Sequence, residues 1–172
     1  MAIRTIITEP NKLLRQISKP VNGVGKEEQK LMDDMLETMY AANGIGLAAI
    51  QIGIPKRIIV IDLNRDEMQK KPMYFVNPVI KKKDQEKVTY EEGCLSVPNQ
   101  FAEVDRPSKC EIEYLDYDGE KKLLSADGLL ATCIQHEMDH LEGILFIDYL
   151  SKLKRSMIIK KLSKLKSTSA EA

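Results

Sequence analysis

Two histidines and a glutamate stand at a spacing that suits metal chemistry. The stretch His136-Glu137-Met138-Asp139-His140 follows the pattern H-E-x-x-H. Helical residues four apart lie one above the other, so both imidazoles can bind one ion at ~2.0–2.1 Å while the glutamate reaches its water. These are the only two histidines of the chain, which argues against a chance cluster of surface residues. The pattern predicts a metal-dependent hydrolase with Glu137 as general acid and base.

The third protein ligand decides the class of metal site. One protease group places a histidine three residues beyond the glycine that follows the motif, but Phe146 stands there. Another group takes a glutamate from a later helix, and beyond Glu142 the only acids are Asp148 and Glu171. Because there is no third histidine, a cysteine is the leading candidate.

Three cysteines compete for that place. Cys133 precedes His140 by seven residues, about 10 Å along a helix axis at ~1.5 Å per residue, so it cannot share an ion with both histidines. We interpret Cys133 as a packed residue lining a pocket, and Cys110 as part of a core strand. Cys94 is the favoured ligand, because the glycine before it allows a close backbone approach and a proline after it ends the strand.

Helices are predicted around the motif. Asp127 can cap the motif helix at its N-terminus, and Gly143 can end it in a left-handed conformation. An amphipathic helix is expected over Lys26–Ala42, and a basic C-terminal helix over 149–166. The apolar face of the C-terminal helix would consist of Leu150, Leu153, Met157, Ile158, Leu162 and Leu165.

Short runs rich in β-forming residues lie between these helices. Strands are predicted at Arg57–Leu63, Met73–Ile80, Lys87–Tyr90 and Lys109–Tyr117. Asp118-Gly119 after the last run favours a hairpin turn. The order of helix, strands and helices indicates an α+β protein, and the lack of repeats or linkers indicates one domain over 1–172.

Composition and charge narrow the class further. With 43% apolar and 30% charged residues, the chain is neither disordered nor fibrous. No apolar run reaches the ~18 residues of a membrane span, and we expect no secretory signal. Three scattered cysteines agree with a reducing compartment, so a cytoplasmic location is expected. Residues 151–170 hold seven Lys or Arg and no acid, which favours an anionic partner there.

Three segments together resemble the peptide deformylase family. Gly44–Gln51 resembles its first motif, Glu92–Ser96 its second and Gln135–His140 its third, in matching order and separation. The resemblance implies hydrolytic removal of the formyl group from formyl-methionine at the N-terminus of nascent peptides. It also implies antiparallel sheets packed around a central helix that carries the metal motif. The implied ion is Fe²⁺, with Zn²⁺, Ni²⁺ or Co²⁺ able to replace it.

The resemblance also assigns roles to individual residues. Cys94 joins the two histidines as the third ligand, which leaves one position for a metal-activated water. Glu137 passes the proton of that water to the departing amine. The Gln51 side-chain amide and the Leu95 backbone N–H stabilise the tetrahedral oxygen. Glu92 orients the cysteine loop and a ligand.

Substrate contacts are predicted beside these groups. The bare backbone of Gly46 would pair with the peptide main chain as an added strand. Phe101 departs from the pattern, since familiar bacterial members carry arginine there, and this puts peptide preferences beyond methionine in doubt. A pocket for methionine would be formed by Ile45, Tyr90, Leu129, Thr132 and Cys133, each of which would otherwise be ordinary core.

Two other functions share part of these features. A metallopeptidase would use H-E-x-x-H, but it gives no reason for Gly44–Gln51 or Glu92–Ser96. A non-enzymatic, metal-stabilised protein that binds the ribosome would need four protein ligands, and only three can be named. The basic C-terminal helix suits ribosomal RNA, so a ribosome contact is expected beside the nascent peptide, and neither DNA nor a membrane is expected as a partner.

Overall fold

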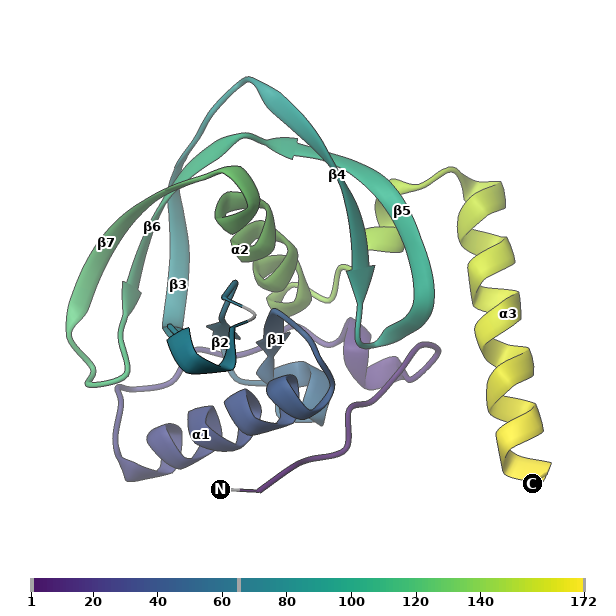
Figure 1. Cartoon of the computed structure of the whole chain (residues 1–172), viewed down its shortest axis with the longest axis horizontal. Helices are drawn as coiled ribbons and strands as arrows, with labels where there is room; N and C mark the ends of the chain where they lie inside the picture. The colour runs from purple at the N-terminus through teal and green to yellow at the C-terminus, as the bar shows by residue number, and fades with distance from the viewer. Residues whose placement is uncertain (1, 65, 172) are drawn as a thin grey trace.

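One helix lies at the centre of the molecule between two β-structures. The computed structural model describes residues 2–64 and 66–171, with side chains described as far as Leu165. Within these residues, a sheet of order β1-β2-β3-β6-β7 and a ribbon of β4 and β5 enclose α2 (Gly128–Leu141), as Figure 1 shows. Every neighbouring pair of strands is antiparallel. The α+β prediction is confirmed.

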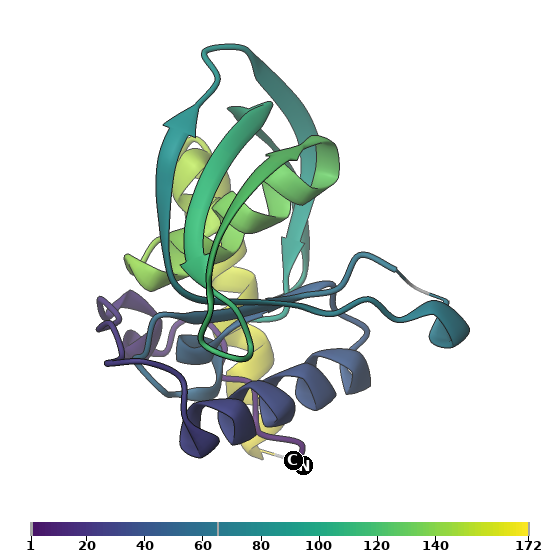
Figure 2. The ribbon, with the colours of Figure 1, turned by 90° about the vertical axis from the view of Figure 1, so that its left-hand side faces the viewer.

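The remaining elements frame this centre. α1 (Lys26–Ala41) crosses below the large sheet, α3 (Lys152–Glu171) stands beside β5, and the segment around η3 projects from the body (Figures 1 and 2). The strands are β1 (Gly46–Ala48), β2 (Ile58–Ile61), β3 (Met73–Lys83), β4 (Lys87–Cys94), β5 (Val97–Pro107), β6 (Lys109–Leu115) and β7 (Lys121–Asp127). The 3₁₀ turns are η1 (Lys12–Arg15), η2 (Ala49–Ile52), η3 (Glu67–Gln69) and η4 (Phe146–Tyr149).

β2 is buried on both faces. Ile59 and Ile61 pack in the core that includes α2, whereas Ile58 and Val60 pack against α1. All four are fully buried. A strand covered by a helix on each face reads as an unbroken apolar run, which explains why this part of the sequence shows no alternation.

The predicted strands were incomplete. β3 and β4 extend beyond their predicted ends, while β6 ends earlier, at Leu115. β1, β5 and β7 had no predicted counterpart. β5 carries polar residues on its outward face and prolines near its ends, so its order depends on pairing with β4 along almost its whole length. Gly119 turns the β6–β7 hairpin with φ of +82°, as its sequence favours.

α3 differs from its prediction at its N-terminus. It begins at Lys152 rather than Tyr149, because Tyr149 closes the 3₁₀ turn η4. Leu162 is buried in a core shared with β5 and η4. Half of the predicted apolar face is instead exposed, namely Leu153, Met157 and Leu165. The apolar face is therefore covered only in part, where the ribbon and η4 pack against the helix.

Among the residues that the structure describes, no helix combines the length and the apolar character that crossing a bilayer requires.

Candidate metal centre

α2 ends as the sequence predicts and begins differently. Gly143 has φ of +73°, and a Cβ there would lie 2.4 Å from the Arg15 carbonyl oxygen, so only glycine fits. Asp127 occupies the N-cap position, but its side chain caps no backbone N–H. That prediction was wrong because Asp127 is also the last residue of β7, where it pairs with Lys109.

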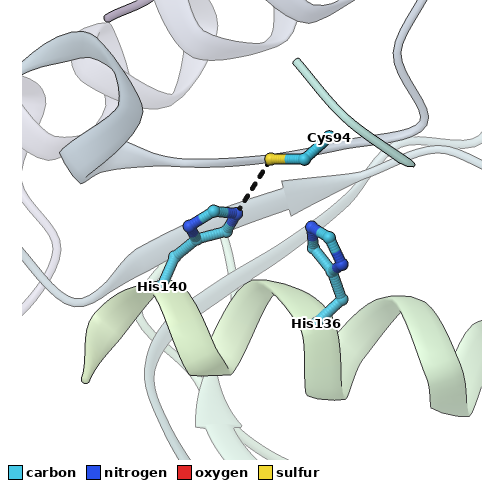
Figure 3. A group of neighbouring side chains, drawn as sticks. All are labelled: Cys94, His136 and His140. Carbon is cyan, nitrogen blue, oxygen red and sulfur yellow. Dashed lines mark hydrogen bonds between the residues drawn. The ribbon is translucent and has the colours of Figure 1, made fainter. Parts of the chain in front are cut away.

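His136 and His140 leave α2 one turn apart and face the end of β4 (Figure 3). The Sγ atom of Cys94 lies 3.4 Å from Nε2 of His140, and the ligand atoms of all three residues lie within 4.8 Å of one another. A register shift between Gly93 and Cys94 interrupts the β4–β5 pairing at this point. Such an irregularity re-aims a side chain, and here it accompanies the turn of the thiol toward the helix.

The donor set fits a divalent transition metal. A thiolate and two imidazoles suit Zn²⁺ and Fe²⁺ alike. His140 is fully buried and His136 nearly so. Beside them, Glu137 Oε2 and Thr132 Oγ1 are buried without a hydrogen-bond partner. Because buried polar atoms are normally satisfied, these two atoms mark the place of a polar ligand next to the three donors.

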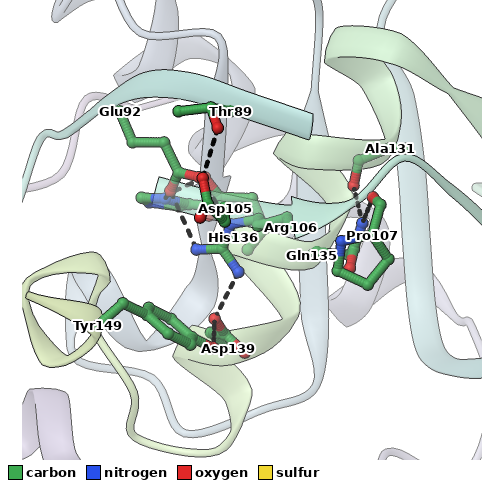
Figure 4. Close-up of polar contacts among 11 residues, drawn as sticks. Thr89, Glu92, Asp105, Arg106, Pro107, Ala131, Gln135, His136, Asp139 and Tyr149 are labelled. Carbon is green, nitrogen blue, oxygen red and sulfur yellow. Dashed lines mark hydrogen bonds and ion pairs between the residues drawn. The ribbon is translucent and has the colours of Figure 1, made fainter. Parts of the chain in front are cut away.

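Glu92 ties His136 to a buried arginine (Figure 4). Its Oε1 lies 2.9 Å from His136 Nδ1, and the guanidinium of Arg106 donates to both carboxylate oxygens at 2.6 and 3.0 Å. Burial opposes ionisation of Glu92, but the hydrogen bonds from His136 and Arg106 outweigh it and lower its pKa. With Nδ1 engaged by a carboxylate, Nε2 of His136 is the nitrogen left for a metal.

Asp139 and Tyr149 complete this network, and neither they nor Arg106 had a role predicted from the sequence. Arg106 also donates to Asp139 at 2.8 Å, and its guanidinium carbon lies 4.9 Å from the centre of the Tyr149 ring. The Tyr149 hydroxyl donates to Asp139 at 2.7 Å. Strand β5, helix α2 and turn η4 therefore meet at one buried guanidinium. The sequence around Arg106 does not predict this meeting, because the partners of the arginine are distant in sequence.

Glu137 is buried against bare backbone. A Cβ at Gly46 would lie 2.7 Å from Glu137 Oε1, so the carboxylate occupies the space that a side chain would fill. Burial raises the pKa of Glu137 to about 7. A carboxyl group with such a pKa can both accept and release a proton near neutral pH. Burial also raises the pKa of Cys133 to about 12, so its thiol stays neutral.

Gln51 and Leu95 both lie next to Cys94. The Gln51 side chain is buried, and its Nε2 lies 3.0 Å from Ser96 Oγ and 3.5 Å from Cys94 Sγ. Its Oε1 accepts from the Ala48 N–H at 2.9 Å, which fixes the amide with its donor side toward the thiol. Leu95 lies in the short connection between β4 and β5 and lines the same cavity as Gln51.

A cavity of about 550 Å³ opens beside these groups. Its size is in the range of small-ligand sites. His140 lies outside its walls, whereas Cys94, His136 and Glu137 form part of them. Leu129 and Phe101 line it and are also exposed to solvent. The cavity includes every residue predicted for substrate contact: Ile45, Gly46, Tyr90, Leu129, Thr132 and Cys133.

Comparisons with known proteins agree in sequence and in structure. Residues 3–156 match the family model described as polypeptide deformylase. The peptide deformylase of Pelagibacter ubique is 76% identical over 97% of both chains, and that of Phenylobacterium zucineum is 59% identical over 95% of this chain and 97% of its own. The crystal structure of peptide deformylase from Ehrlichia chaffeensis superposes with a TM-score of 0.93 at 42% identity, over 98% of this chain and 99% of that one. The chain belongs to the polypeptide deformylase family.

Proposed function

We propose that this chain works as a peptide deformylase through the cavity beside Cys94, His136 and His140. Peptide deformylases are metal-dependent hydrolases that remove the N-formyl group from nascent peptides. The observation that carries the proposal is the meeting of three ligand atoms within 4.8 Å, next to the buried Glu137, at the wall of a cavity. A metallopeptidase or a closed structural metal site would leave Gly44–Gln51 without a use.

The three donors hold one divalent ion in this proposal. When bound, such an ion lowers the pKa of a coordinated water toward ~7 and polarises the formyl oxygen. We assign Fe²⁺ as the ion in the cell on family resemblance, with Zn²⁺, Ni²⁺ or Co²⁺ as substitutes, because the donor set suits several of them. Anaerobic purification with elemental analysis tests the assignment. Active protein that contains another metal and no iron would contradict it.

Glu137 moves the proton in the proposed reaction. Its carboxylate accepts a proton from the attacking water, whose oxygen adds to the formyl carbon. As the C–N bond breaks, Glu137 returns the proton to the amine nitrogen, so that formate and a free N-terminus leave. The Gln51 Nε2–H and the Leu95 backbone N–H donate to the formyl oxygen as negative charge develops there. The bonds of Gln51 to Ser96 and Ala48 support this role, since they hold the amide in place before substrate arrives.

The cavity would hold the first residue of the peptide. The peptide backbone pairs with β1 at Gly46, because β1 is an edge strand of the sheet and the missing side chain leaves room for the Glu137 carboxylate beside it. The methionine side chain lies among Ile45, Tyr90, Leu129, Thr132 and Cys133. The neutral Cys133 thiol supports this assignment, because a thiolate there would disfavour an apolar ligand.

Formate release tests the function directly. Formyl-Met-Ala-Ser should yield formate and Met-Ala-Ser, whereas unformylated Met-Ala-Ser should remain intact under the same conditions. Cleavage of Met-Ala-Ser would favour the metallopeptidase. Absence of formate from protein loaded with Fe²⁺ would overturn the proposal.

We also infer a ribosome contact through α3, in the cytoplasm where nascent chains are made. Lys152, Lys154, Lys160 and Lys161 are exposed on this helix, and their charge complements ribosomal RNA. Leu162 fixes the helix to the ribbon, which supports a single domain over 1–172. Co-sedimentation with ribosomes at increasing salt tests the contact. Ribosome binding that does not weaken with salt, or that persists after deletion of residues 152–172, would contradict a contact through α3.

A further inference from the structure

A second hollow lies beside the catalytic cavity, between the β4–β5 ribbon and α3. It has a volume of about 890 Å³ and is open to solvent, and we call it the outer groove. α3 forms one wall with Met157 and Ile158, and the outward face of the ribbon forms the other. Figure 1 shows α3 beside β5. The outer groove and the catalytic cavity share Glu91, Gln100 and Phe101 in their walls.

Phe101 forms the boundary between the two hollows. Its ring lies over Gly93, where a Cβ would come within 2.5 Å of Cε1, and Gly93 directly precedes the metal ligand Cys94. The side chain is nevertheless 66% exposed. An aromatic ring in that position contributes little to the core and offers its apolar face to whatever leaves the cavity.

The walls of the outer groove carry charged residues of both signs beside apolar ones. The ribbon contributes Glu91 and Glu103, and α3 contributes Lys154 and Lys161 on the opposite wall. Within the described part of the chain, none of these four side chains has an ion-pair partner. The exposed side chain of Met157 lies on the α3 wall with these two lysines. The outer groove therefore offers partners for acidic, basic and apolar side chains at once.

We propose that the outer groove binds the part of the formylated nascent peptide that follows the first two residues, an inference that rests on the proposed function. Continuity argues for this occupant, because the groove begins at Phe101 where the catalytic cavity ends. An extended peptide advances ~3.3 Å per residue, so a chain anchored by its methionine crosses Phe101 within a few residues. A groove lined by acidic, basic and apolar residues can bind peptides of many sequences. The substrates require this, because nascent chains differ in the residues that follow the methionine.

Peptide length gives the test. We would compare kcat/KM for formyl-Met-Ala-Ser with that for formyl-Met-Ala-Ser-Val-Leu-Lys, using the metal-loaded enzyme. The longer peptide should react about tenfold faster in kcat/KM, through a lower KM, which corresponds to about 1.4 kcal/mol. Met157→Asp puts a charge in place of an apolar side chain on the α3 wall of the groove. The ratio of kcat/KM for the longer peptide to that for the shorter one should then fall to about two.

Leu153→Asp is the matched control. Leu153 is 72% exposed, lies one turn earlier on the same helix and does not line the outer groove, so the ratio should stay near ten. Equal kcat/KM for the two peptides in the unmodified enzyme, or the same ratio in both variants, would overturn the proposal while leaving deformylation intact. No formate from either peptide would overturn the proposed function instead. Thermal melts of both variants would establish that each is folded.

Discussion

The helices α2 and α3 differ in how far the structure covers their apolar residues. Both are amphipathic segments with regularly spaced apolar residues. In α2, residues 131–137 are all buried, polar ones included. In α3, Leu162 is the buried leucine, while Leu153 and Met157 face solvent. The difference lies in what surrounds each helix, since α2 is enclosed by a sheet and a ribbon and α3 has neighbours on one side.

This contrast separates chemistry from binding. Enclosure removes water from His136 and Glu137, so their polar atoms depend on partners within the protein or on a bound ligand. The pKa of Glu137 is raised as a result. Exposure leaves the apolar residues of α3 without such a role in the core. They remain available to a ligand, and they tolerate substitution.

The largest effect is expected at the enclosed carboxylate. Glu137→Gln keeps the shape and removes the proton acceptor, so kcat for formyl-Met-Ala-Ser should fall by about 10³-fold while the bound metal stays near one per chain. Glu142→Gln is the matched control on the exposed end of the same helix, and it should retain near-normal kcat. Steady-state kinetics with metal analysis measures both. Near-normal turnover in Glu137→Gln would contradict the proposed mechanism.

A substitution at Arg106 tests the hydrogen-bond network that holds His136 through Glu92. Arg106→Met leaves the buried Glu92 and the partly buried Asp139 without their cation, which should cost about 3–5 kcal/mol in the free energy of unfolding. Metal affinity should also fall by about 10–100-fold, because Glu92 no longer holds His136. Lys121→Met removes an exposed ion pair with Glu113 and should leave the free energy of unfolding nearly unchanged. Denaturant titration measures the free energy of unfolding, and metal competition measures the affinity. Equal values for the two variants would contradict the role given to Arg106.

Much of the candidate metal centre could be predicted because its signals are local. His136, Glu137 and His140 lie within five residues, so helix geometry alone places them together. Cys94 could be favoured by excluding the other cysteines. The resemblance supplied Gln51 and Leu95, which have no local signature of their own.

The missed parts depend on contacts between distant segments. Arg106 meets Glu92 across the ribbon and Asp139 on α2, and no spacing in the sequence records that meeting. β5 owes its order to β4, and the packing of α3 depends on which of its residues reach the ribbon. Periodicity shows that a helix has an apolar face, but it does not show how much of that face will be covered.

Gly46 lies at the wall of the cavity, against the enclosed carboxylate of Glu137. Gly46→Ala places a methyl group 2.7 Å from the original position of Glu137 Oε1, so the carboxylate must move. A displacement of this size should lower kcat/KM by about 10²-fold with the metal retained, because proton transfer depends on geometry. Gly25→Ala, whose Cβ would find only an ordinary contact with Glu28, should leave kcat/KM unchanged. Full activity in Gly46→Ala would show that Glu137 has more freedom than this packing implies.

The smallest effect is expected on α3, where one leucine is covered and another is not. Leu162→Ala removes a side chain that is 3% exposed and should lower the free energy of unfolding by about 2 kcal/mol. Leu153→Ala should change it by less than about 0.5 kcal/mol. Both should hydrolyse formyl-Met-Ala-Ser normally, since α3 lies outside the cavity. Urea titration decides, and equal destabilisation would mean that α3 packs differently. If the outer groove binds peptide, Leu162→Ala should also lower the preference for the six-residue substrate, because this leucine holds the helix against β5.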